Sequence, residues 1–268
     1  MTPAPISSQP CLAARLASLR TVLAAICAAC ALLPGLAAAQ GSTAAGKDRY
    51  IALINPNSNA NTTQSMTDIA LTATGGIKVE GKSNEGVPPL LTTPKDLADA
   101  LPGVVKIGVE AAQDPKVGAI IVSAFGDPGL PELRAKVGVP VFGIREQAFH
   151  EAAKGGRPFG IATTTPDPGL LEGFRQTAVA LGYGAQFRGT RATPGDPNAL
   201  MKKSPEELDA ALAEAVRASA ADGAKAVIIG GGPLTASALR LQPKFDMPLV
   251  VPVIAAAQAA ADSIRKSK

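Results

Sequence analysis

Short runs rich in Val and Ile alternate along this chain with longer alanine-rich stretches that have helical spacing. This alternation is typical of a parallel sheet, because neighbouring parallel strands are joined by a crossover that is usually a helix. The runs predict strands near 50–54, 78–81, 119–122, 139–142, 159–162, 185–188, 226–229 and 249–251. Helices are expected between them, notably over 62–73, 95–113, 166–181, 205–221 and 254–265.

Part of this pattern occurs twice. Segment 118–121 leads through a Gly-rich loop to Pro140, and segment 225–229 leads through another to Pro248. The repeat predicts an α/β fold of two pseudo-symmetric lobes, each with a mainly parallel sheet flanked by helices. A ligand cleft would lie between them, where the carboxyl ends of the strands meet. Chance similarity between two buried strands is the alternative.

Residues 1–39 have the features of a secretory signal peptide. Two arginines and no acidic residue accompany an apolar run over 22–33, and small residues follow. Ala37 and Ala39 fit a cleavage site that leaves Gln40 at the new N-terminus, so a periplasmic or secreted location is expected. A membrane anchor is the alternative, but a proline interrupts the run before the roughly 20 residues that span a bilayer. We therefore expect no stable membrane insertion after cleavage.

The chain after the predicted signal peptide is divided into a linker, two lobes and a C-terminal segment. The linker is 40–49, the first lobe is 50–153 and the second is 154–245. Residues 246–268 are expected to form a final strand and helix that return to the first lobe.

The processed chain would contain no cysteine. All three, Cys11, Cys27 and Cys30, lie in the leader, and His150 is the only histidine. Disulfides and multi-ligand thiol or imidazole metal sites are thereby excluded, and no metal or cofactor is expected. The formal net charge of +4 includes two leader arginines and comes without a basic cluster, which argues against nucleic acid. The expected partner is a small molecule, and a homo-oligomer is compatible with the sequence.

Two polar loops follow predicted strands. Asn55, Asn57 and Ser58 offer amides and a hydroxyl where a helix begins, which suits a carboxylate or carbonyl. The alternative is that Asn57 or Ser58 only caps the helix. After the fifth strand, Thr165 is the expected cap before Pro166, which leaves Thr163 to face a ligand.

Two glycine-containing loops complete the candidate site. Gly231 and Gly232 would let a ligand approach bare backbone at the start of a helix, without the spacing of a nucleotide-binding motif. In the string 125–129, Asp127 is either an acid/base carboxylate or the cap of the next helix, and we favour the cap. His150 lies within a predicted helix and is expected to be a surface or packing residue.

These loops together resemble the aspartate/glutamate/hydantoin racemase superfamily, nearest its hydantoin racemase branch. The similarity extends over about 50–264 and is carried by five strings in order, at 54–58, 124–130, 139–144, 160–164 and 228–233. In that family two α/β lobes enclose the substrate, and one cysteine from each lobe lies on either face of its Cα. A thiol suits the role because its pKa lets it act as acid or base. In this chain Ala124 and Gly231 stand at the two cysteine positions.

The resemblance implies a substrate pocket lined by a set of residues that match the family in place. They are Asn55, Asn57, Ser58, Phe125, Gly126, Thr163, Gly231 and Gly232. Asp127 is the one nearby candidate for proton transfer. The expected function is an exported isomerase acting at the Cα of an amino-acid derivative or a hydantoin-like compound without the usual cysteine pair. A non-catalytic periplasmic binding or sensing protein for a small carboxylate or cyclic imide is the alternative.

Overall fold

The computed structural model describes residues 48–267. The predicted signal peptide, its three cysteines and most of the linker lie outside the described residues. Within residues 48–267, no helix is both long and apolar enough to cross a membrane.

All eight predicted strands are present, with ends shifted by a few residues. They are β1 Tyr50–Asn55, β2 Val79–Ser83, β3 Val117–Val122, β4 Val141–Gly143, β5 Phe159–Thr163, β6 Phe187–Ala192, β7 Ala226–Gly230 and β8 Leu249–Val250. The helices are α1 Ala60–Ala73, α2 Pro94–Ala111, α3 Leu130–Arg134, α4 Ile144–Ala152, α5 Pro168–Ala180, α6 Pro197–Leu200, α7 Pro205–Ala221, α8 Thr235–Leu241 and α9 Pro252–Lys266. Short 3₁₀ turns lie at Lys154–Gly156, Gly232–Leu234 and Gln242–Lys244.

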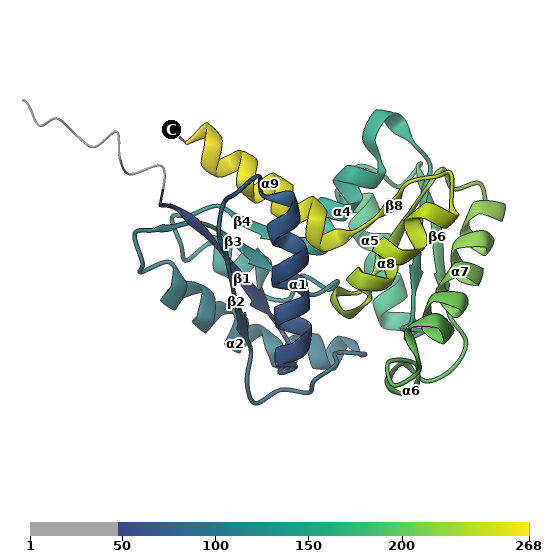
Figure 1. The fold of residues 1–268 in the computed structure, drawn as a ribbon, viewed down its shortest axis with the longest axis horizontal. Coiled ribbons are helices and arrows are strands. Elements are labelled where there is room, and N and C mark those ends of the chain that lie inside the picture. The colour runs from purple at the N-terminus through teal and green to yellow at the C-terminus, as the bar shows by residue number, and fades with distance from the viewer. Residues whose placement is uncertain (1–47, 268) are drawn as a thin grey trace, which may run out of the picture. The chain divides into compact units, whose positions relative to one another are not determined.

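The strands form two four-stranded sheets with the same internal order. The first is β2-β1-β3-β4 and the second is β6-β5-β7-β8, with every pairing parallel. The predicted α/β fold with two pseudo-symmetric lobes is therefore confirmed. Figure 1 shows the first sheet with α1 and α9 on one side of the molecule and the second lobe, with α7 and α8, on the other.

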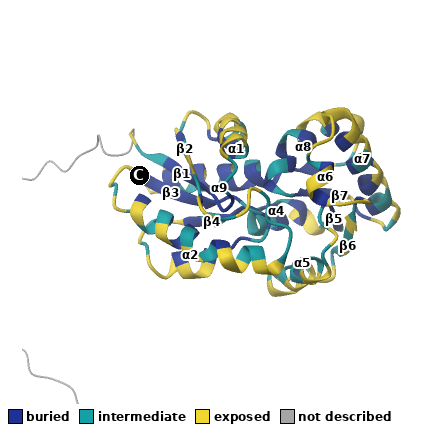
Figure 2. Ribbon diagram, turned by 90° about the horizontal axis from the view of Figure 1, so that it is seen from below, coloured by how far each residue is buried: buried dark blue, intermediate teal, exposed yellow. Residues whose placement is uncertain are grey.

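Both sheets are covered on both faces, which explains why their central strands are continuously apolar. In the first sheet, Ile51 and Leu53 pack with α1 and α9, whereas Ala52 and Ile54 pack with α2 and α3. In the second, one face packs with α7 and α8 and the other with α4 and α5. Figure 2 shows the central strands as a buried layer between partly exposed helices.

The two lobes exchange helices. Helix α4 follows the last strand of the first sheet but packs on the second sheet through Ala148, Phe149 and Ala152. Helix α9 follows the last strand of the second sheet but packs on the first through a row of buried alanines. Helices α4 and α9 also contact each other.

This exchange corrects the division of the chain made from the sequence. Residues 246–268 were expected to return to the first lobe as a strand and a helix, but β8 pairs with β7 of the second sheet, and only α9 returns. Likewise α4, assigned to the first lobe within 50–153, packs on the second. Chain order alone does not show on which sheet a terminal helix packs.

Local capping rules succeeded at one helix and failed at another. Helix α7 has the predicted bounds, and Ser204 and Glu207 form a capping box at its start with two bonds of 3.2 Å, as the Ser-Pro-Glu-Glu sequence at 204–207 favours. Helix α5 begins later than expected: Asp167 caps it and Pro168 takes its first turn, so Thr165 is not the cap. A polar cap followed by proline occurs twice here, as Thr165-Pro166 and as Asp167-Pro168, and α5 begins at the second pair.

Phe149 provides a test of the exchange, because its ring is fully buried among second-lobe aromatic side chains although its helix follows the first sheet. We expect Phe149→Ala to lower the free energy of unfolding by about 3–5 kcal/mol. Val179→Ala, at a helical side chain that is 56% exposed, should change it by less than about 0.5 kcal/mol. Urea denaturation followed by circular dichroism measures both, and a loss below about 1 kcal/mol at Phe149 would contradict the packing described.

Candidate active site

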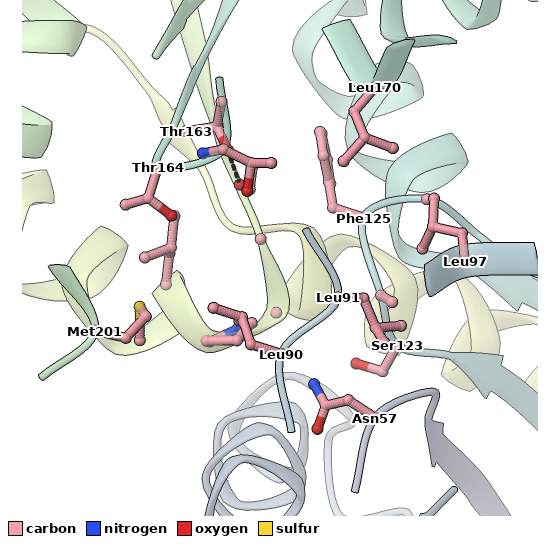
Figure 3. Close-up of a pocket in the computed structure, with 18 of the residues that line it drawn as sticks. Asn57, Leu90, Leu91, Leu97, Ser123, Phe125, Thr163, Thr164, Leu170 and Met201 are labelled. Carbon is pink, nitrogen blue, oxygen red and sulfur yellow. Dashed lines mark hydrogen bonds between the residues drawn. The ribbon is translucent and has the colours of Figure 1, made fainter. Parts of the chain in front are cut away.

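A pocket lies where the carboxyl ends of the central strands of both sheets meet. Loops after β1 and β3 form one side, and loops after β5 and β7 form the other, as open α/β sheets lead one to expect. The cavity volume is about 60 Å³. Figure 3 shows its polar side chains on both lobes. The lining residues are Asn57, Leu90, Leu91, Leu97, Ser123, Ala124, Phe125, Gly126, Thr163, Thr164, Thr165, Leu170, Phe174, Met201, Gly230, Gly231, Gly232, Pro233 and Leu234.

Of the three predicted polar residues after β1, only Asn57 lines this pocket. Asn55 is fully buried behind it and donates to the Oδ1 of Asn57 at 2.8 Å and to the hydroxyl of Thr63 at 2.9 Å. The backbone N–H of Asn59 also donates to that Oδ1, so the amide nitrogen of Asn57 is left to donate toward the cavity. Ser58 is half-buried outside the pocket.

Neither Asn57 nor Ser58 caps α1. Asn59 is the cap, and its side chain accepts from the N–H of Thr62 at 3.1 Å. The capping alternative for Asn57 was therefore wrong, and its conformation is instead fixed by the buried Asn55.

The glycine loop after β7 presents backbone rather than side chains. The N–H groups of Gly231 and Gly232 donate no hydrogen bond within residues 48–267, and both glycines line the pocket. Thr163 lines it too, but its hydroxyl donates to the carbonyl of Gly230 at 2.8 Å. Thr163 therefore braces the glycine loop, in contrast to the expectation that its hydroxyl is free for a ligand.

Close packing explains why this loop needs glycine. A Cβ on Gly232 would lie 2.7 Å from the Sδ of Met66, and one on Gly230 would lie 2.8 Å from the ring of Phe125. Gly231 has a φ of 150°, in the region that L side chains rarely adopt.

The two positions that the resemblance assigned to cysteines both line the pocket, Ala124 from the first lobe and Gly231 from the second. Within residues 48–267, no Asp, Glu, His, Lys, Arg, Tyr or Cys side chain lines it. The pocket can donate hydrogen bonds and surround apolar groups, but its own side chains cannot take up a proton near neutral pH. Nor does the described part of the chain contain a cluster of three or more metal-ligating side chains.

Asp127 is close to the pocket loop in sequence but does not line the pocket. It is 6% exposed, and its two carboxylate oxygens accept from the backbone N–H groups of Arg145, at 3.0 Å, and Glu146, at 2.9 Å. Asp127 thus caps α4, where the N–H of Arg145 lies 18 residues later in the chain. It does not cap the next helix, α3, because Gly129 holds that position. Burial raises the pKa of Asp127 to about 6, and the Arg145 guanidinium and the two N–H groups oppose that rise. Proton transfer by Asp127 stays a prediction, and these contacts weigh against it.

His150 and Ser123 are engaged elsewhere. The Nδ1 of His150 lies 2.9 Å from the hydroxyl of Tyr183, away from the lining residues, which fits the packing role expected of it. The Ser123 hydroxyl donates to the Sδ of Met66 at 3.1 Å and has no imidazole partner.

The apolar part of the pocket was missed by the sequence analysis. It comprises Leu90, Leu91, Leu97, Leu170, Phe174, Met201 and Leu234. Apolar side chains in helices look like core residues in a sequence. Leu90 and Leu91 are the exception, because the sequence gives a reason to suspect a ligand contact. They are adjacent leucines in a loop rich in Pro and Thr, where no helical or strand periodicity assigns them to the core.

Fold and site define a two-lobed α/β protein with a small-molecule pocket at the facing edges of its sheets. Residues 51–260 match the model of the Asp/Glu/Hydantoin racemase family, and the chain belongs to that family. Membership places it among racemases, which are isomerases.

Two curated relatives and one solved structure illustrate the similarity. The chain is 30% identical to the hydantoin racemase of Paenarthrobacter aurescens, over 78% of this chain and 89% of the relative. It is 27% identical to the hydantoin racemase of Rhizobium meliloti, over 79% of this chain and 87% of that relative. The structure of allantoin racemase from Klebsiella pneumoniae superposes with a TM-score of 0.73 at 26% identity, covering 82% of this chain and 89% of that one. These relatives support the hydantoin racemase branch.

The raised pKa of Asp127 predicts a specific dependence of stability on pH. Because the folded chain binds this proton more tightly than an ordinary Asp with a pKa of 3.8, Asp127 contributes stability below about pH 4 that is lost as the pH rises through about 6. Relative to Asp127→Asn, the free energy of unfolding of the unmodified chain should fall by on the order of 3 kcal/mol between pH 4 and pH 7. Urea titrations at both pH values measure the free energy of unfolding of each protein. If the difference between the unmodified chain and Asp127→Asn does not change with pH, the carboxyl stays ionised.

Proposed function

We propose that this chain is an exported isomerase that acts at the Cα of a hydantoin-like ring or a related amino-acid derivative without a cysteine pair. The observation that supports this is the pocket itself, since Ala124 and Gly231 face the same cavity from the two lobes of a chain similar to hydantoin racemases.

The available groups suit the stabilisation of an enolate. Loss of the Cα proton moves negative charge onto the adjacent carbonyl oxygen, where the amide nitrogen of Asn57 and the N–H groups of Gly231 and Gly232 can donate. Each such donor typically contributes about 10²- to 10³-fold. The apolar side of the pocket would hold the substituent on the Cα.

The proton itself must pass to and from water in this proposal, because no titratable side chain lines the described pocket. A positioned acid or base typically contributes about 10²- to 10⁴-fold, so turnover should be slower by that order than in an enzyme with two thiols. The favoured substrates are those whose Cα proton is already acidic, as it is next to a ring carbonyl in a cyclic ureide.

Proton NMR in D₂O tests this function. With 5-benzylhydantoin and allantoin as probes, we expect the Cα-proton signal to disappear faster with the purified chain (residues 40–268) than in its absence. Asn57→Leu, which keeps the side-chain size but removes the amide donor, should lower that rate by about 10²-fold. Exchange equal to the protein-free control for every probe would contradict catalysis.

A non-catalytic binding or sensing protein is the second candidate. The observation that favours it is the lack of any titratable side chain among the lining residues. Probe-dependent line broadening and a raised melting temperature without exchange would identify it, whereas absence of any stabilising ligand would contradict it.

A thiol at position 124 should restore proton transfer on one face of the substrate. We expect Ala124→Cys to increase the rate of Cα exchange of one probe enantiomer by at least 10-fold. The rate of exchange should exceed the rate of racemisation, because the opposite face of the substrate still lacks an acid. Ala124→Ser is the matched control, with similar size and no thiol. Chiral chromatography beside the NMR assay separates the two rates. Equal exchange in the Cys and Ser variants would mean that position 124 does not face a Cα.

Export through residues 1–39 is part of the proposal. Residues 1–49 fused to alkaline phosphatase should give an active reporter, since that enzyme needs disulfides that form outside the cytoplasm. The pair Leu23→Arg and Ile26→Arg, which interrupts the apolar run, should abolish the activity. Equal activity with and without these substitutions would argue against a signal peptide.

A further inference from the structure

The loop between β3 and α3, residues 123–129, carries Ala124, Phe125 and Gly126 into the pocket, and the second lobe holds it in place. The ring of Phe125 lies 5.1 Å from that of Phe174 in α5, centroid to centroid, in an edge-to-face arrangement. The same ring lies against Gly230, where a Cβ would approach it to 2.8 Å. A first-lobe loop is thus anchored in a second-lobe core.

Asp127 makes the second attachment of this loop. Its carboxylate accepts from the first two backbone N–H groups after Ile144, at the start of α4, and α4 is the helix that packs on the second sheet. The contact is closely enclosed, because a Cβ on Gly143 would lie 2.4 Å from the carboxyl carbon of Asp127.

The backbone of Asp127 is shaped for this contact. Its φ of 47° is the one positive φ at a non-glycine among residues 48–267. Asp and Asn tolerate this conformation better than other L residues, and such strain persists where the surroundings hold it. The conformation turns the side chain toward α4 while Gly126, one residue earlier, lines the pocket.

The charges around Asp127 also belong to this contact. The Nε of Arg145 lies 3.9 Å from the carboxylate and has no hydrogen-bond partner, and Glu146 pairs with Arg134 at 2.8 Å. With both oxygens occupied by α4, the carboxylate is held away from the lining residues.

We propose that Asp127 is a positioning residue: it fastens the pocket loop to the start of α4 and thereby sets where Ala124 to Gly126 lie relative to the second-lobe glycines. The effect on ligand affinity rests on the proposed function, whereas the effect on the loop does not. This role can be distinguished from proton transfer with Asp127→Asn. The carboxamide oxygen can still accept a hydrogen bond from α4, but the carboxamide cannot exchange a proton with substrate.

The experiment compares Asp127→Ala with Asp127→Asn in residues 40–268. Backbone amide hydrogen exchange, measured by NMR, reads the loop without any ligand. In Asp127→Ala we expect exchange to accelerate at least 10-fold at the amides of Arg145 and Glu146, which lose their acceptor. The amide of residue 127, which donates to the carbonyl of Ala124 at 2.9 Å within the loop, should accelerate with them. Asp127→Asn should restore most of the protection. Unchanged protection in Asp127→Ala would overturn the proposal.

The second readout is the Kd for 5-benzylhydantoin at pH 7. Asp127→Ala should weaken it at least 10-fold and Asp127→Asn less than 3-fold, whereas Ile264→Ala, a buried change in α9 outside the pocket lining, should leave the Kd of the folded protein unchanged. Full loss of Cα exchange in Asp127→Asn at unchanged Kd would identify a catalytic group and overturn the proposal.

Two further outcomes are distinguishable. If Asp127→Ala does not fold, Gly143→Ala displaces the carboxylate while keeping Asp127, and should reproduce the faster amide exchange; normal protection there counts against the proposal. If the unmodified chain neither binds nor exchanges the probe, the proposed function fails, and the amide readout still decides the role of Asp127.

Discussion

The exchange of α4 and α9 between the lobes is the constraint on which the rest of this structure depends. Each helix leaves the sheet that precedes it and fills one face of the other, and the two helices contact each other. The burial of Phe149 in one lobe and of the α9 alanines in the other therefore holds the facing edges of the sheets together. A pocket of about 60 Å³ between four loops needs such a support, because movement of one lobe by an ångström or two would change every distance across it.

Several aspects followed from the sequence because they depend on local patterns. Most of the eight strands were predicted from runs of Val and Ile, and the Ser204 capping box marks the start of α7. The repeated strand and loop predicted two similar α/β lobes, whereas the shared strand order of their sheets came from the structure. Asn57 and Gly231 were predicted at the site because loops after parallel strands converge at one edge, whereas Ala124 was assigned to it by the family resemblance.

Other aspects depended on contacts between distant residues. The Asp-Pro pair at 127 looked like the start of the next helix, yet Asp127 caps α4 instead, because the loop folds back across β4. Asn55 looked like a ligand-binding amide, but its amide nitrogen donates to Asn57, before α1, and to Thr63, within α1. The destination of α4 and α9 could not be read from their apolar faces, since either sheet offers a matching surface. Local rules identify which groups need partners, and only the tertiary structure supplies them.

The two positions that the resemblance assigns to cysteines differ in what the surrounding structure would accept. Ala124 itself has no positive φ, although Asp127 in the same loop does, so a larger side chain at position 124 is a question of space alone. Gly231 has a φ of 150°, and a Cβ there would approach Leu234 at 3.2 Å, so both its conformation and its neighbours suit glycine. The second-lobe loop presents two backbone donors at the place where a side chain would otherwise stand. Hydrogen-bond donors favour charge on a substrate oxygen, whereas a thiol acts on a proton. In the proposed function this loop would therefore stabilise the enolate, and the proton would pass to solvent.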